Sequence, residues 1–218
     1  MRKIIIDTDP GQDDALAMMT AFGAKKDLNV LGVTCVAGNV PLELTSVNAL
    51  KICELSGFFS VPVFKGSPAP MKRKLITAEH VHGKTGLDGT DLSVKKKELE
   101  PTDAVDFIIE CTEKYRDEKI TICALGPLTN IAKVLKQDTV LTESIEEIVL
   151  MGGGFFEGGN ITPAAEFNIY VDPEAAKIVL ESGLKITMLP LDVTHKTLVQ
   201  RNFLEKLRKS GKNSAIQA

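Results

Sequence analysis

Four aspartates stand close together near the amino terminus, directly after the short apolar run of residues 4–6. Because side chains alternate along a strand, Asp7 and Asp9 share one face at its carboxyl end, and Asp13 and Asp14 begin the helix that follows. Two like charges about 4 Å apart repel by about 4 kcal/mol at an effective dielectric of about 20, more than a helix dipole offsets. The cluster therefore predicts a bound cation, and its all-oxygen ligands favour Ca²⁺ or Mg²⁺ over zinc.

Taken singly, Asp13 or Asp14 also suits an ordinary acidic first turn of a helix, with no metal involved. The combination with Asp7 and Asp9 points to a site, because open α/β sheets place their ligands at the carboxyl ends of strands. We therefore interpret residues 7–14 as the start of a functional site.

Polar turns follow later strands in the same way. Asn39 comes after the apolar segment 28–36, and Leu125 ends the segment 120–125 before a Gly-Pro turn. The carboxyl ends of parallel strands share one edge of a sheet, so both turns should lie beside the aspartates. Asn39 also suits an ordinary left-handed turn, and Leu125 can offer its main-chain carbonyl alone, because its side chain belongs in the core.

Two long connections carry further candidate residues. The segment 66–101 is long for a loop and contains His82 in a glycine-rich stretch, which suits a lid, although an exposed histidine is the simpler alternative. The segment 152–172 offers amide, carboxylate and aromatic groups that could contact the hydroxyls and ring of a sugar. These groups belong to Asn160, Glu166, Phe167 and Asn168.

The elements that position these residues alternate between strand and helix. Strands are predicted at residues 4–6, 28–36, 61–64, 120–125, 145–151 and 185–189. Helices are predicted at residues 13–25, 41–55, 102–115, 131–135, 173–182 and 197–209. Thr102 is the expected cap of its helix, and Pro62 suggests an edge strand. This order predicts an α/β fold, one domain over residues 1–218, with an open, mainly parallel sheet flanked by helices.

Composition argues against several classes of function. A net charge of −3, no Trp and 5% aromatic residues give no basic or stacking surface for nucleic acid or for an anionic membrane. Neither a signal peptide nor a membrane span is expected, so we predict a cytoplasmic protein. The four cysteines are widely scattered and are expected to be reduced: Cys35, Cys53, Cys111 and Cys123.

The stretch from Asp7 to Ala17 reads Asp-Thr-Asp-Pro-Gly-Gln-Asp-Asp-Ala-Leu-Ala and resembles the amino-terminal signature of the inosine/uridine-preferring nucleoside hydrolases. Two later segments keep the order of that family: His-Gly-x-x-Gly from His82, and Gly-Asn-x-Thr-Pro-Ala-x-Glu-Phe-Asn up to Asn168. The resemblance implies a Rossmann-like nucleoside hydrolase fold, a homo-oligomer, and Ca²⁺-dependent hydrolysis of the N-glycosidic bond of ribonucleosides.

The same resemblance assigns roles to residues. Ca²⁺ would be held by Asp9, Asp14 and the carbonyl of Leu125, and Asp9 would take a proton from the attacking water. His82 would contact the leaving base and donate a hydrogen bond or proton to it. Asp7 would support the cluster without reacting. The family positions that would bind the substrate are Asp13, Asn39, Asn160, Glu166, Phe167 and Asn168.

Family members extend beyond the last residue of this chain and carry a late His-Asp pair, whose Asp is another Ca²⁺ ligand. His195 belongs to the segment Leu-Asp-Val-Thr-His upstream of that pair, and no His or Asp follows residue 196. On this comparison we expect weak Ca²⁺ binding, and weak turnover or none, from the chain.

Two other functions fit parts of the sequence. Haloacid-dehalogenase-like phosphatases also carry Asp-x-Asp after a first strand, with Asp7 as nucleophile, Asp9 as acid and Mg²⁺ between them. That interpretation leaves Asp13, Asp14 and the segment 160–168 unexplained. A homologue that binds ribose or Ca²⁺ without turnover is the non-enzymatic alternative.

Overall fold

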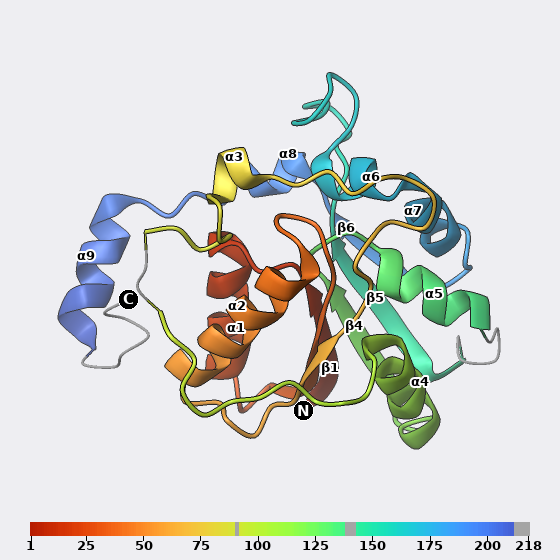
Figure 1. The fold of residues 1–218 in the computed structure, drawn as a ribbon, viewed down its shortest axis with the longest axis horizontal. Coiled ribbons are helices and arrows are strands. Elements are labelled where there is room, and N and C mark those ends of the chain that lie inside the picture. Colours follow the sequence, from red (N-terminus) through yellow and green to blue (C-terminus); the bar gives the residue numbers. More distant parts are fainter. Residues whose placement is uncertain (90–91, 138–142, 212–218) are drawn as a thin grey trace.

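The computed structural model describes residues 1–89, 92–137 and 143–211, which form an open sheet flanked by helices (Figure 1). Within these ranges six parallel strands pair in the order β3-β2-β1-β4-β5-β6. Their bounds are β1 Arg2–Thr8, β2 Leu28–Cys35, β3 Val63–Lys65, β4 Ile120–Ala124, β5 Ile145–Met151 and β6 Ile186–Leu189. The α/β class and the parallel sheet expected from the sequence are confirmed, and β3 is an edge strand as Pro62 suggested.

The direction in which the chain crosses the sheet reverses beside β1. The chain runs outward from β1 through β2 to β3 and then returns to place β4 on the other side of β1. Such a reversal leaves a crevice outside the carboxyl ends of the two central strands. Asp7 pairs with Ala124 in this register, so the residues that follow β1 and β4 meet at that crevice.

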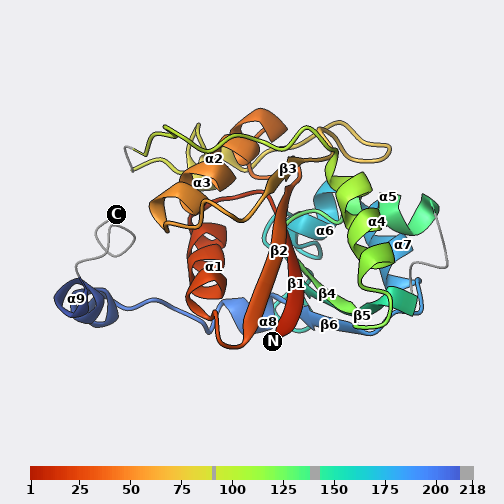
Figure 2. The same cartoon turned by 90° about the horizontal axis from the view of Figure 1, so that it is seen from below.

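Helices cover both faces of the sheet. Figure 2 shows α1 (Gln12–Gly23) and α2 (Leu42–Leu55) on one side of the strands and α4 (Ala104–Lys114), α5 (Thr129–Gln137) and α7 (Pro173–Leu180) on the other. The expected pattern of long helices is therefore present. One cap differs from expectation, because Asp103 and not Thr102 accepts the hydrogen bond at the start of α4.

Three short helices occupy segments that the sequence suggested were loops or turns: α3 (Glu79–His82), α6 (Phe167–Val171) and α8 (Leu191–Thr194). Each is too short for hydrophobic periodicity to reveal it. A longer helix, α9 (Arg201–Ser210), lies apart from the sheet in both views (Figures 1 and 2). Within the described ranges, no helix has both the length and the apolar character needed to cross a bilayer.

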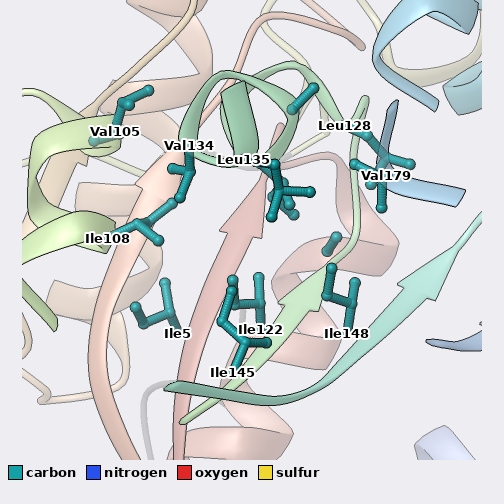
Figure 3. Packing of buried hydrophobic residues seen from close by; sticks show 14 of the residues in the cluster. Ile5, Val105, Ile108, Ile122, Leu128, Val134, Leu135, Ile145, Ile148 and Val179 are labelled. Carbon is teal, nitrogen blue, oxygen red and sulfur yellow. The ribbon is translucent and has the colours of Figure 1, made fainter. Parts of the chain in front are cut away.

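Alternation along β1 builds a core on each side of the sheet. Ile4 and Ile6 pack among the apolar residues under α1 and α2, whereas Ile5 packs on the side of α4, α5 and α7. Figure 3 shows Ile5, Ile122 and Ile148 side by side from three neighbouring strands. The strand therefore presents odd-numbered side chains to α5 and even-numbered ones to α1. The same alternation holds for Asp7 and Thr8 at its end.

Truncation of Ile122 to alanine is expected to lower the free energy of unfolding by about 2–5 kcal/mol, because the side chain is fully buried and its removal leaves a cavity. Urea unfolding followed by circular dichroism measures the change. Leu198→Ala is the matched control, since this leucine is 75% exposed and its truncation should cost less than about 0.5 kcal/mol. Equal losses in the two variants would contradict the assignment of the core.

Candidate active site

The parity of β1 sends its last side chains to different helices. Asp7 lies on the side of α5, where its Oδ1 accepts hydrogen bonds from Asn130 Nδ2 at 2.8 Å and from Thr34 Oγ1 at 2.6 Å. Thr8 lies on the side of α1, and its hydroxyl donates to Asp14 Oδ1 at 2.8 Å. The end of the strand is thus fixed to both helical layers by side-chain hydrogen bonds.

Asp9 lies beyond the strand in the crevice between β1 and β4. Its Oδ2 accepts the backbone N–H of Asn39 at 2.7 Å, and Asn39 Nδ2 donates to the carbonyl of Asp9 at 3.0 Å. Its Oδ1 is buried and has no hydrogen-bond partner among the described residues. Glycines wall it in, since a Cβ at Gly126 would lie 2.3 Å from Oδ1 and one at Gly38 would lie 2.1 Å from Oδ2.

Burial disfavours the ionised form of these carboxylates. It raises the pKa of Asp7 to about 6 and, together with the charge of Asp13, that of Asp14 to about 7. The pKa of Asp9 is raised well above its ordinary range, first by burial and then by the charge of Asp14. Positive charge placed among these groups would favour their ionised forms.

The structure also brings the 152–172 segment to this edge. Asn168 Nδ2 donates to the carbonyl of Leu125 at 2.8 Å, so α6 is attached to the end of β4. Glu166 caps α6 and accepts the backbone N–H groups of Asn168 and Gly153, each at 3.0 Å. Burial raises the pKa of Glu166. Asn160 Oδ1 accepts a hydrogen bond from the N–H of Phe167, the first residue of α6, at 2.9 Å. This bond joins the middle of the loop to its end.

A cavity of about 260 Å³ is lined in part by residues of α3 and α6. These two helices lie at the upper side of Figure 1. The residues predicted from the sequence that line it are Asp13, Asp14, Asn39, His82, Leu125, Asn160, Glu166, Phe167 and Asn168. Asp9 does not line it, because this residue is 1% exposed and lies behind Asn39. Nine of the ten predicted site residues therefore line one cavity, and the tenth, Asp9, is hydrogen-bonded to a residue of its wall. Their roles stay predictions.

His82 lies at the end of α3, on the wall of the cavity. Its Nδ1 contacts Gln12 Oε1 at 2.7 Å, and the other end of α3 is attached by the N–H of Ala78, which donates to the carbonyl of Asn39 at 2.9 Å. Burial lowers the pKa of His82 and His80 lowers it further, while Asp13 opposes both. This part of the long 66–101 connection is therefore an ordered wall of the site.

The residues present have the right donor chemistry for Ca²⁺. Within the described part of the chain, no group of three or more His, Cys, Asp or Glu side chains is arranged to hold a metal. The candidate set is the one that the family resemblance implies, two carboxylates and one carbonyl. The buried, unpartnered Oδ1 of Asp9 fits a cation neighbour. Asp14 Oδ1 and the carbonyl of Leu125 each accept a hydrogen bond from a side chain and keep a further lone pair.

Several residues of the site were missed by sequence reasoning. Asn130 is fully buried, and besides Asp7 it bonds the carbonyl of Cys35 at 3.0 Å and the N–H of Ser67 at 2.8 Å, which joins three strand ends. Its position at the end of the turn after β4 was a usable signal. Gln12 lies inside the acidic signature, but nothing local to it indicated its contact with His82.

Comparisons with known proteins agree with this geometry. A family model described as "Inosine-uridine preferring nucleoside hydrolase" matches residues 4–218. The pyrimidine-specific ribonucleoside hydrolase RihB of Escherichia coli is 43% identical over 210 residues, which are 96% of this chain and 66% of that protein. The chain spans 62 to 66% of the length of the first curated relatives that it matches.

Solved structures show the same likeness. A plant nucleoside hydrolase has a TM-score of 0.92 and 36% identity, covering 99% of this chain and 69% of that one. A purine-preferring ribonucleoside hydrolase from Gardnerella vaginalis has a TM-score of 0.91 and 35% identity, covering 99% of this chain and 70% of that one. On the family match and these likenesses, the chain belongs to the inosine-uridine preferring nucleoside hydrolase family.

Proposed function

We propose that this protein hydrolyses the N-glycosidic bond of ribonucleosides, releasing the free base and ribose, with Ca²⁺ as cofactor. The single observation that carries the proposal is the buried Asp9 with its unpartnered Oδ1, bonded to Asn39 at the edge of a cavity lined by Asp13, Asp14 and three asparagines. Membership of the family supports the reaction class. A cytoplasmic location and a homo-oligomeric state stay predictions from the sequence.

The chemistry sets clear demands on the site. Breaking the bond develops positive charge on the ribose and leaves an electron-rich base. Asp9 Oδ1 accepts a proton from water as the water oxygen bonds to the anomeric carbon, and the neighbouring carboxylates of Asp13 and Asp14 stabilise the positive sugar. Ca²⁺, held by Asp9, Asp14 and the carbonyl of Leu125, would keep these acids ionised and orient the water.

The polar lining of the cavity suits a ribose. Asn39 and Asn168 line the cavity from separate segments of the chain, where each is held by a hydrogen bond to a backbone carbonyl, and Asn160 and Glu166 are held by the hydrogen bonds that close the α6 loop. Because these side chains are fixed before substrate arrives, they can bind hydroxyl groups at a low cost in side-chain entropy. His82 stands on the cavity wall as the donor to the departing base.

The phosphatase alternative requires Asp7 as an exposed nucleophile. Asp7 is fully buried, and its Oδ1 is occupied by Asn130 and Thr34 on the side of α5. The family match favours glycoside hydrolysis over reaction with a phosphate ester. A non-catalytic protein that binds ribose or Ca²⁺ is separated from the hydrolase by measuring turnover and binding on the same sample.

Asp9→Asn is expected to lower kcat for uridine or inosine by about 100-fold or more, because the water loses its proton acceptor. Release of ribose, measured by a reducing-sugar assay with Ca²⁺ present, checks this. Asp106→Asn, which neutralises an exposed acid on α4, is the matched control and should keep full activity. Full activity of Asp9→Asn would contradict the assigned base, and release of phosphate from an aryl phosphate in place of ribose from nucleosides would support the phosphatase.

Removal of Ca²⁺ should make stability depend on pH in a defined direction. The folded-state pKa of Asp7, about 6, lies above the ordinary 3.8, so the folded state binds the extra proton and stability falls as pH rises from about 4 to about 6. This shift corresponds to a loss on the order of 3 kcal/mol. The melting temperature in chelator should therefore be lower at pH 8 than at pH 5.

Added Ca²⁺ should restore more stability at pH 8 than at pH 5, because a cation binds the ionised acids. Differential scanning calorimetry at both pH values, with chelator and then with Ca²⁺, measures both effects. Asp9→Asn is the comparison variant, and its response to Ca²⁺ should be much smaller. An equal response of wild type and variant would argue against a cation at Asp9.

A further inference from the structure

The contact between Gln12 and His82 has two parts that fix each other. Gln12 Nε2 donates to the backbone carbonyl of His82 at 3.3 Å, while Gln12 Oε1 faces His82 Nδ1 at 2.7 Å. A backbone carbonyl can only accept, so the amide must turn its NH₂ group toward that carbonyl and its oxygen toward the ring. An amide oxygen can also only accept, so Nδ1 must carry a proton.

Resting on the proposed function, we infer that Gln12 is a positioning residue that keeps the Nδ1 proton of His82 in a hydrogen bond, so that Nε2 is the ring atom that gains a proton when the ring is charged and delivers it to the leaving base. The two residues are 70 positions apart in the chain. The contact therefore joins the acidic turn after β1 to the wall of the cavity, and it sets which nitrogen of the ring is available to substrate.

A second feature of the same turn supports this function. A Cβ at Gly11 would lie 2.4 Å from His82 Nδ1 and 2.7 Å from Cε1. The ring therefore packs directly against the backbone of the turn, and a side chain at position 11 would collide with it. Gly11 provides the space and Gln12 provides the hydrogen bond. Two adjacent residues of the signature are thus fitted to one histidine.

Other tethers hold the histidine segment in place independently of Gln12. Asn48 Nδ2 donates to the carbonyl of Pro10 at 3.2 Å and to the carbonyl of Thr85 at 2.7 Å, which bridges the turn to the residues after α3. Ala78 is bonded to Asn39 at the other end of α3. Loss of the Gln12 side chain should therefore release the tautomer and tilt of the ring while leaving the wall of the cavity in place.

The proton balance of the step follows from this arrangement. In the charged form of His82 both nitrogens carry protons, and the Nδ1 proton stays with Gln12. As the bond between C1′ and the base breaks, its electron pair goes to the base, and the Nε2 proton moves to a nitrogen or oxygen of that base. Asp9 takes one proton from the attacking water, whose oxygen bonds to C1′. The products are neutral base and ribose. Asp9 then releases its proton to solvent, and His82 Nε2 recovers one from solvent.

Gln12→Leu tests the inference, because Gln12 is exposed at the start of α1 and its replacement should not disturb the core. The readout is a comparison of two leaving groups. Hydrolysis of uridine or inosine needs protonation of the base and should lose about tenfold or more in kcat. Hydrolysis of 4-nitrophenyl ribofuranoside releases a stable phenolate that needs no proton, and it should change by less than about threefold.

The tautomer itself can be measured without turnover. In ¹⁵N-labelled protein, the two ring nitrogens of His82 should show a protonated Nδ1 and a bare Nε2 in the wild type above the His82 pKa, and a mixture of tautomers in Gln12→Leu. His82→Ala removes the proton donor, so the double variant Gln12→Leu/His82→Ala should be no slower on nucleosides than His82→Ala. Gln200→Leu, an exposed change elsewhere, is the matched control.

The outcomes separate the possibilities. An equal loss on both substrates would mean a structural role for Gln12, and no loss on either would mean that the contact does not serve catalysis; both overturn the inference. A wild type that releases no base from any nucleoside would overturn the proposed function instead, and the tautomer measurement would still decide whether Gln12 fixes the ring of His82.

Discussion

The structure depends on holding several carboxylates inside a protein interior that disfavours their charge. Asp7, Asp9 and Asp14 are all buried at the end of one strand, and burial is the largest cause of the rise in the pKa of each. The hydrogen bonds from Thr34, Asn39 and neighbouring residues satisfy most of their oxygens, but among the described residues Asp7 Oδ2 and Asp9 Oδ1 have no partner. Such a group costs free energy unless a ligand or a reaction uses it.

The parallel sheet supplies the geometry that this cluster needs. Side chains alternate along β1, so Asp7 points toward α5 and Thr8 toward α1. Each helical layer therefore holds the end of the strand by a hydrogen bond. The reversal of strand order beside β1 then leaves Asp9 facing the end of β4, where Leu125 and Asn168 meet. The cavity therefore combines groups from six separate parts of the chain at one edge: residues 13–17, 39, 78–82, 125, 151 and 160–168.

Sequence reasoning predicted the fold and the gathering of the site better than the details within it. Apolar runs located the strands, and the rule for parallel sheets placed Asn39 and Leu125 beside Asp9. The burial of Asp9 behind the cavity, and the contact of Gln12 with His82, depend on tertiary packing between distant segments, which no local pattern encodes. The short helices were not predicted for a related reason. For example, α6 is stabilised by the Glu166 cap and by tertiary contacts, not by a periodic pattern of its own.

The hydrogen bonds of the buried Asn130 side chain can form only after residue 130 has been synthesised. Its partners Asp7, Cys35 and Ser67 lie 123, 95 and 63 residues earlier in the sequence. During synthesis from the amino terminus, the first half of the chain therefore emerges with its acidic strand end still lacking this amide. Because contacts of such long sequence separation form slowly, the reactive edge should mature late in folding, after α5 has docked.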